Sequence, residues 1–135
     1  MDIIRCWEEK GVTIPEPNHR HIKVMLARDI RNTPELLFSQ AIIYPGGQTE
    51  EHSHDRPELI QVISGRGISK SEDGQVDLEP DMVLWVKPGE VHQIMNPFPE
   101  QLKISAVFVP AFEAKEHLER IENEAIQAKK NSENS

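Results

Sequence analysis

Two histidines separated by one residue, and a glutamate that follows them, have the types and spacing of a metal site. His52 and His54 lie in a stretch that we expect to be extended. Alternate side chains of a strand share one face, so both imidazoles project together with their Cα atoms about 7 Å apart. Residues 55–57, Asp-Arg-Pro, predict a tight reversal. Glu58 opens the next β-branched run, so a hairpin returns its carboxylate beside the imidazoles, a donor set that suits a divalent first-row metal.

A fourth ligand candidate lies in a separate segment. Residues 81–86 predict a short apolar strand, residues 87–90 a turn, and residues 92–96 the return strand. His92 follows its turn in the way that Glu58 follows its own reversal. His92 is therefore the fourth ligand candidate.

The spacing of these residues resembles the motifs of the cupin superfamily. The first motif is glycine, five residues, His-any-His, three residues, glutamate, six residues and glycine, and it is matched throughout by Gly46, His52, His54, Glu58 and Gly65. In the second motif Gly89, His92 and Asn96 match, whereas Asp81 stands for a glycine and Lys87 for a proline. The departures fall on turn positions, so we expect an altered loop with the ligands retained. The resemblance covers roughly residues 20–110.

The resemblance implies an all-β double-stranded β-helix that binds one divalent ion per chain, Fe, Mn, Ni or Zn. The ligand set implied is His52, His54, Glu58 and His92. The function implied is a metal-dependent enzyme of dioxygenase, isomerase, decarboxylase or lyase type. Its substrate would be small and oxygenated, of anionic or enolisable character. The alternative is a non-catalytic module that binds a small molecule or a metal, because fold alone does not fix function.

The rest of the pattern agrees with this fold class. Short strands separated by turn signals follow Gly65, and Leu102, Ile104, Ala106 and Phe108 alternate with polar residues near the end of the sheet. Such a pattern is typical of an antiparallel sandwich or barrel. We divide the chain into an N-terminal arm (1–19), the barrel (20–110), a C-terminal helix (111–130) and a frayed tail (131–135). The resemblance also implies a homodimer, in which the arm or the outer sheet meets the second copy.

Composition excludes several other classes. The chain has 135 residues and a formal net charge of −8, which suits one domain and argues against nucleic acid or an anionic membrane as partner. No apolar run approaches the roughly 20 residues of a membrane span. The N-terminus becomes charged too early for a signal peptide, and Cys6 is the one cysteine. We therefore expect a cytoplasmic protein whose partner is a small molecule.

The residues that contact the substrate are harder to assign. In the strand over residues 36–44, Gln40 and Tyr44 share one face and Ser39 lies on the other. If the first face looks inward, Gln40 and Tyr44 are near the metal; if it looks outward, Ser39 takes the interior place. The pattern leaves both alternatives open. Gln40, Tyr44 and Asn96 are our candidate substrate-binding residues, and no catalytic residue is assigned.

The C-terminal segment changes to helical periodicity over residues 112–130. Its narrow apolar stripe consists of Leu118, Ile121 and Ala125. Its charged residues at a spacing of four, which we expect to form a solvated face, are Glu116, Arg120 and Glu124. His117 lies beside them and is not expected to be a ligand. The helix is predicted to lie along the barrel or along a partner subunit.

Overall fold

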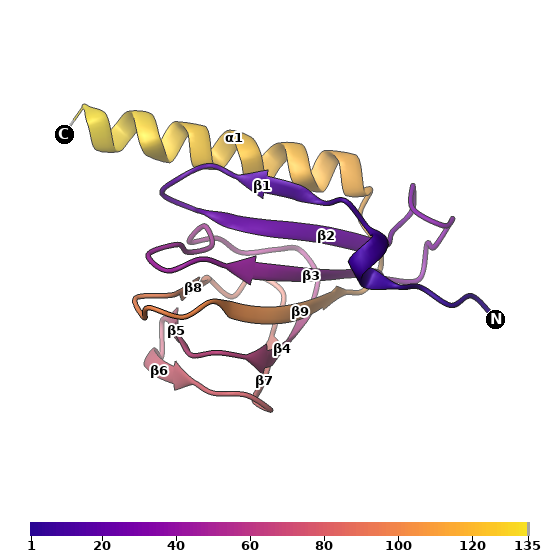
Figure 1. The fold of residues 1–135 in the computed structure, drawn as a ribbon, viewed down its shortest axis with the longest axis horizontal. Coiled ribbons are helices and arrows are strands. Elements are labelled where there is room, and N and C mark those ends of the chain that lie inside the picture. Colours follow the sequence, from indigo (N-terminus) through magenta and orange to yellow (C-terminus); the bar gives the residue numbers. More distant parts are fainter. Residues whose placement is uncertain (135) are drawn as a thin grey trace.

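Two antiparallel β-sheets face each other in the computed structural model, which describes residues 1–134, and a long helix lies along one side (Figure 1). The larger sheet comprises, in spatial order, β1 (Val12–Ile14), β2 (Arg20–Leu26), β3 (Leu37–Ile43), β9 (Leu102–Phe108), β4 (Glu58–Ser64) and β7 (Val83–Val86). The smaller sheet comprises β6 (Gly74–Leu78), β5 (Gly67–Ser71) and β8 (His92–Met95). A short 3-10 helix, η1 (Cys6–Glu8), precedes the strands, and α1 (Ala114–Glu133) follows them. The predicted double-stranded β-helix with a C-terminal helix is confirmed.

Alternation of side chains along the strands builds the interior of the barrel. In β9 every second residue is buried, and these are Leu102, Ile104, Ala106 and Phe108, as the sequence pattern predicts. The first three of them meet Leu78 of β6 and Ile94 of β8 from the smaller sheet in one apolar cluster. This cluster joins the two sheets face to face.

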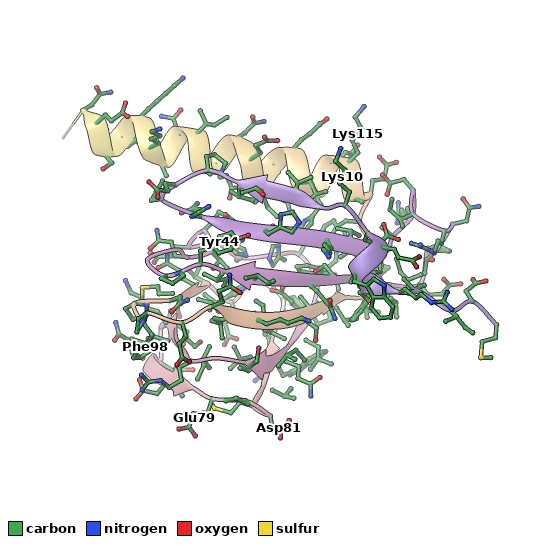
Figure 2. The ribbon with its side chains drawn as sticks, viewed as in Figure 1. Lys10, Tyr44, Glu79, Asp81, Phe98 and Lys115 are labelled. Carbon is green, nitrogen blue, oxygen red and sulfur yellow. The ribbon has the colours of Figure 1, made fainter. Side chains whose placement is uncertain are left out.

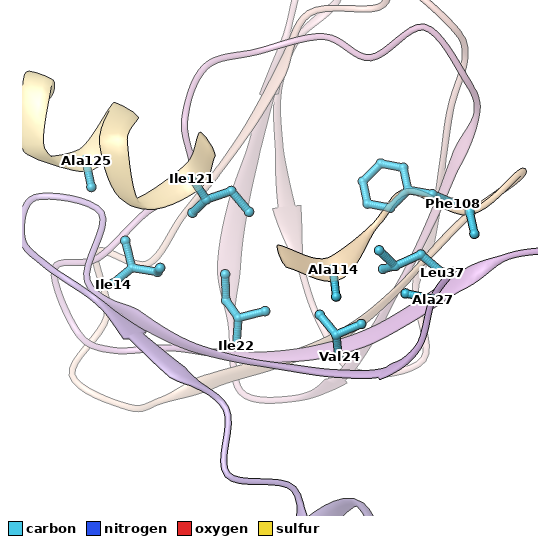
Figure 3. Packing of buried hydrophobic residues seen from close by; sticks show 10 residues of the cluster. Ile14, Ile22, Val24, Ala27, Leu37, Phe108, Ala114, Ile121 and Ala125 are labelled. Atoms are coloured by element: carbon cyan, nitrogen blue, oxygen red, sulfur yellow. The ribbon is translucent and has the colours of Figure 1, made fainter. Parts of the chain in front are cut away.

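A second apolar cluster attaches α1 to the larger sheet (Figure 3). Ile121 and Ala125 of the helix pack with Ile14 of β1 and Ile22 of β2. Fully burying an isoleucine side chain contributes about 1.5–3 kcal/mol, so this seam alone accounts for several kcal/mol of helix docking. The helix therefore packs on the barrel of its own chain.

The bounds of α1 differ from those predicted because its first turn is held by a distant residue. The carboxylate of Asp29 accepts hydrogen bonds from the backbone N–H groups of Ala114 (2.6 Å) and Lys115 (3.1 Å). This cap, contributed by the loop after β2, sets the start two residues later than the sequence predicted. The helix continues to Glu133, through residues expected to fray, and Ser135 lies outside the described residues.

The turns of the two motifs adopt the positive φ angles that glycine favours. Gly65 has φ 85°, and a Cβ there would lie 2.1 Å from the carbonyl oxygen of Gln101. Asp81, at the exposed turn between β6 and β7 (Figure 2), replaces a motif glycine and still adopts φ 71°. Aspartate is one of the few residues other than glycine that visit this left-handed region. The substitution at Asp81 therefore leaves the path of the chain toward His92 in place.

The N-terminal arm is tied to its own barrel by one short edge strand. β1 pairs with β2 in the register Thr13 to His21, and Ile14 is fully buried. The strand ends at Pro15, as expected for an edge position. Among residues 1–134, no helix is both long enough and apolar enough to cross a lipid bilayer.

Candidate metal centre

Backbone pairing between the two motifs brings the four predicted ligands together. His52 and His92 form an isolated antiparallel bridge in which each N–H donates to the other's carbonyl oxygen, at 3.1 and 2.9 Å. The N–H of Gly89 donates to the carbonyl oxygen of His54 at 2.8 Å. Glu58 is the first residue of β4, directly after the predicted reversal. Two turns and one bridge thus place all four side chains on the interior face.

The four side chains converge on a small volume. One donor atom from each of His52, His54, Glu58 and His92 lies within 4.8 Å of all the others. The carboxylate oxygen Oε1 of Glu58 is 3.1 Å from Nε2 of His92 and 3.7 Å from Nε2 of His54. Glu58 and His92 are buried, at 7% and 6% exposure. These four residues can hold a metal ion.

Backbone hydrogen bonds orient two of the imidazole rings so that their Nε2 atoms face the cluster. Nδ1 of His52 lies 2.6 Å from the carbonyl oxygen of Glu50, and Nδ1 of His92 lies 2.9 Å from that of Glu90. A carbonyl only accepts, so each Nδ1 carries a proton; Nε2 of His52 then presents a lone pair, whereas Nε2 of His92 shares a proton with the Glu58 carboxylate 3.1 Å away. This second hydrogen bond is the usual way to orient a metal-binding histidine.

One buried nitrogen gives the strongest indication that the site takes a ligand. Nε2 of His54 is buried and has no hydrogen-bond partner within residues 1–134. A buried unpaired nitrogen costs about 1–3 kcal/mol and is rare in folded proteins. A divalent ion shared with Glu58 and His92 would satisfy this atom, so the donor set fits such an ion.

The protonation states of His52 and His54 suit metal binding, whereas Glu58 and His92 retain a proton. Burial lowers the pKa of His52 to about 4 and that of His54 to about 3, and neighbouring histidines add to both shifts. Burial raises the pKa of Glu58, which its hydrogen bond to His92 partly offsets. Burial alone would lower the pKa of His92, but its bonds to Glu58 and to the Glu90 carbonyl raise it. The Glu58–His92 pair therefore holds a proton that a metal ion must displace.

A cavity of about 330 Å³ opens beside the cluster. Most of its wall is apolar and consists of Ile22, Ala41, Ile104, Ala106, Phe108, Phe112 and Ile121. The polar side chains in the wall include Ser39, Thr49 and Ser53, besides the ligands and several charged groups. Volumes of this size suit small organic molecules.

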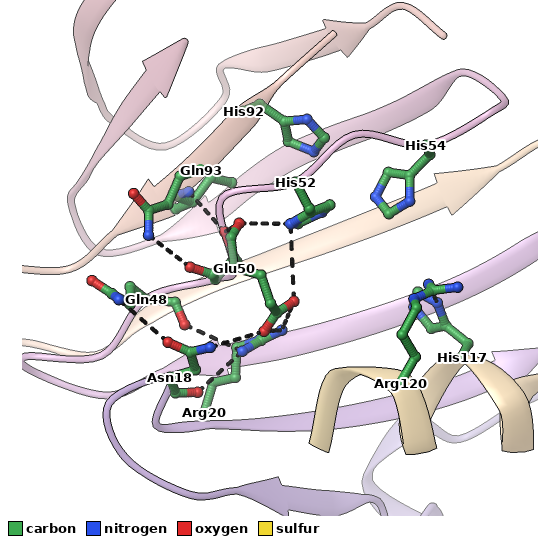
Figure 4. A network of polar contacts seen from close by, with 12 residues as sticks. Asn18, Arg20, Gln48, Glu50, His52, His54, His92, Gln93, His117 and Arg120 are labelled. Atoms are coloured by element: carbon green, nitrogen blue, oxygen red, sulfur yellow. Dashed lines mark hydrogen bonds and ion pairs between the residues drawn. The ribbon is translucent and has the colours of Figure 1, made fainter. Parts of the chain in front are cut away.

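A buried ion pair between Arg20 and Glu50 lies next to His52 (Figure 4). Nη2 of Arg20 lies 2.8 Å from the carboxylate of Glu50, and its Nη1 donates to the carbonyl oxygens of Asn18 and Gln48. Glu50 precedes His52 by two residues and also holds its Nδ1 through the backbone carbonyl. This ion pair was not predicted from the sequence. The signal was parity, because Arg20 lies on the same face of β2 as Ile22 and Val24, and both of these are buried.

The charged face predicted on α1 is exposed at Glu116, Arg120 and Glu124, but two of these residues also border the cavity. Arg120 and Glu124 line the cavity, together with His117, which is buried. Figure 4 shows His117 and Arg120 extending from α1 toward the histidine cluster. The buried stripe runs through Ala114, His117, Ile121 and Ala125, so His117 is part of it and Arg120 lies at its edge. The helix thus contributes polar groups to the site.

The structure resolves the alternatives for the β3 strand in favour of Ser39. Ser39 and Ala41 point into the cavity, whereas Gln40 lies on the outer face. Tyr44 packs against His19, with a distance of 4.5 Å between the two ring centroids. Neither Gln40 nor Tyr44 lines the cavity. Asn96 is buried, but its amide donates to the carbonyl oxygens of Ile43 and Glu100, so it secures a loop and does not face the site. Substrate contacts at these three positions are not part of the function proposed below.

Comparison with known proteins agrees with the geometry. A family model described as Cupin domain matches residues 40–109. A predicted oxalate decarboxylase from Thermotoga maritima is 20% identical, with 81% of this chain and 99% of that chain covered and a TM-score of 0.73. Ectoine synthase from P. lautus is 16% identical, with coverages of 89% and 86% and a TM-score of 0.73. A Cupin 2 conserved barrel domain protein from Salinispora arenicola is 25% identical, with coverages of 73% and 82% and a TM-score of 0.62. No curated protein matches the chain in sequence.

Proposed function

The chain belongs to the cupin family, and we propose that it is a metal-dependent enzyme acting on a small oxygenated substrate. The residues that would hold one divalent ion are His52, His54, Glu58 and His92. Three imidazoles and one carboxylate suit Fe, Mn, Ni or Zn. Structural zinc sites are often rich in thiolates, and this cluster has none.

The convergence of four donor atoms around an unpaired nitrogen carries this proposal. The side chains of His52, Glu58 and His92 each have a hydrogen-bond partner. Nε2 of His54 has none within the described residues. A purely structural cluster would be expected to pair this atom with a protein group. The arrangement is therefore suited to an added ligand.

The residues around the cluster would bind and orient the substrate. The backbone carbonyls of Glu50 and Glu90 fix two imidazole rings, so the donor atoms need little reorganisation. The apolar wall formed by residues such as Ile104 and Phe108 excludes water around a small molecule. A bound divalent ion would supply Lewis acidity toward substrate oxygens.

Metal content combined with turnover tests the proposal. Chelator-treated protein is reloaded separately with Fe(II), Mn(II), Ni(II) and Zn(II), and bound metal is measured by elemental analysis. Oxygen uptake and product formation are then followed with diketones, catechols and hydroxy acids. We expect one ion per chain and turnover with at least one substrate and metal. Metal binding without turnover would favour a non-catalytic binding module, and absence of stoichiometric metal would refute the proposal.

We also propose that two copies of the chain associate through the outer face of the larger sheet. Over β7, β4, β9 and β3, two neighbouring rows of this face carry no charge. They consist of Trp85, Leu59, Val107 and Phe38, and of Val83, Gln61, Ser105 and Gln40. Trp85 and Val83 are 58% and 55% exposed. Each copy carries a net charge of −8, so an uncharged apolar face is where two copies can meet with little repulsion.

A further inference from the structure

We propose that Arg120 and His117 of α1 form an anion-binding end of the cavity, and that the substrate is a small carboxylate with an apolar body. This inference deepens the proposed function, because it names the substrate class of the same site. It depends on side chains that lie outside the metal cluster. It can therefore be tested with and without metal.

Of the two arginines that line the cavity, only Arg120 has its charge available. The guanidinium of Arg20 is buried and bonded to the Glu50 carboxylate. Arg120 makes no ion pair with a carboxylate within residues 1–134, and it lies at the exposed edge of the helix. A guanidinium of this kind can pair with a carboxylate through two parallel N–H donors.

The contact between Arg120 and His117 fixes which nitrogen of His117 carries the proton. Nη2 of Arg120 lies 2.7 Å from Nδ1 of His117. A guanidinium can only donate, so Nδ1 accepts and the proton of the neutral ring is on Nε2. Burial, reinforced by the charge of Arg120, lowers the pKa of His117 to about 3 and keeps the ring neutral. His117 is 5% exposed and lines the cavity, so the Nε2–H is the donor that its neutral ring can offer to a bound molecule.

The packing of aromatic rings holds this pair facing the cavity. The His117 ring stacks on Phe112 with an interplanar angle of 8° and a centroid distance of 5.5 Å. The Arg120 guanidinium lies 5.4 Å from the centroid of Phe112. The guanidinium carbon of Arg56 lies 3.8 Å from the centroid of the Phe112 ring. The same guanidinium donates to the carbonyl oxygens of Pro110 and Ala111. The stack therefore links the anion-binding pair to the hairpin between His54 and Glu58.

An apolar surface separates the anion-binding pair from the metal cluster. The centroid of the Phe108 ring lies 4.7 Å from the centroid of the His54 ring and 5.3 Å from that of the His117 ring. A molecule that reaches both ends must lie across Phe108, which favours an apolar body. Glu124 also lines the cavity, and burial raises the pKa of its carboxyl. In its ionised form Glu124 would repel a second anionic group, so a single carboxylate fits better than two.

Matched pairs of small ligands test this inference. Binding of pyruvate and pyruvamide, and of benzoate and benzamide, is measured by calorimetry on chelator-treated and Zn(II)-loaded protein. The variants are Arg120→Gln, Arg120→Lys and His117→Phe, of which the last keeps the ring stacked on Phe112. Lys115→Gln is the control, since it removes a positive charge from the same helix away from the cavity.

We expect the wild-type protein to bind at least one carboxylate about tenfold or more tightly than its amide, in both metal states. Arg120→Gln should abolish this preference, Arg120→Lys should retain part of it, and His117→Phe should weaken it severalfold. Lys115→Gln should leave it unchanged. Metal content should be the same in all four variants. An unchanged preference in Arg120→Gln, or no preference in the wild type, would overturn the inference. Loss of metal binding from the wild type, with the preference intact, would refute only the proposed function.

Discussion

Replacing His54 with leucine should stabilise the metal-free protein and destroy its response to metal. Nε2 of His54 is buried without a partner, and its ring lies against Phe108 and Phe112. In the absence of an ion, burial of the unpaired imidazole nitrogen therefore costs desolvation free energy. Leucine has a similar size and no polar atom, so its burial carries no such cost. The substitution exchanges an unsatisfied polar group for an apolar one that packs against Phe108 and Phe112.

The expected magnitudes predict that the order of stability reverses with metal. Removing the unpaired nitrogen should raise the free energy of unfolding by about 1–3 kcal/mol without metal. A metal at 1,000 times its dissociation constant should stabilise the wild type by about 4.1 kcal/mol. The His54→Leu variant lacks a ligand and should gain little. The wild type should therefore be the less stable protein in chelator and the more stable one in saturating metal.

Urea unfolding at pH 8, followed by fluorescence of Trp7 and Trp85, measures both quantities. The metal response should be unchanged in the control His19→Leu, because His19 lies outside the cluster. A His54→Leu variant that is less stable than wild type in chelator would refute the reasoning about the unpaired nitrogen. A variant that metal still stabilises fully would show that His54 is not a ligand.

Three further predictions concern the cluster, the helix and the outer sheet. Glu58→Gln should keep weakened metal binding and His92→Ala should lose it, as elemental analysis of proteins loaded in parallel would show; full metal in His92→Ala would contradict this. Because the pKa of His117 falls from 6.5 to about 3 on folding, the unfolded chain binds more protons between these values and stability is lost as pH falls. Wild type should lose about 1 kcal/mol more than His117→Phe between pH 7 and 5.5 in urea titrations without metal, and parallel curves would be evidence against a buried neutral ring. Trp85→Arg should convert a dimer to a monomer in light scattering, whereas Val76→Arg on the smaller sheet should not; a monomeric wild type would exclude the dimer.

The ligand set was accessible from the sequence because it depends on local geometry. His52 and His54 share a face of an extended segment, and one reversal returns Glu58. His92 required a second hairpin and a bridge to His52, which no local rule supplies. Its assignment depended on the resemblance of the spacing to a known motif. Asp81 was compatible with that motif because aspartate tolerates the positive φ of its turn.

The other residues of the cavity depend on tertiary packing and were missed or misplaced. A strand pattern leaves open which face looks inward, and only the pairing of β3 between β2 and β9 placed Ser39 inside and Gln40 outside. Arg20 was overlooked because an arginine at an inward position is unusual unless it is paired. Its partner Glu50 lies 30 residues away in sequence.

The position of the exposed charged face of α1 beside the cavity was unpredicted for a similar reason. Helical periodicity identified an apolar stripe but could not show that the barrel has an opening beneath it. The Asp29 cap and the seam at Ile121 fix the helix over that opening. Arg120, at the edge of the stripe, then faces the cavity, although the spacing alone is typical of a solvated position.

Anomalous diffraction from crystals of the metal-loaded protein, collected at the absorption edge of the bound metal, would locate the ion directly. We predict one strong anomalous peak per chain, coordinated by Nε2 of His52, His54 and His92 and by the Glu58 carboxylate. No such peak between these four residues, or a peak held by other side chains, would contradict the assignment of this cluster as a metal centre.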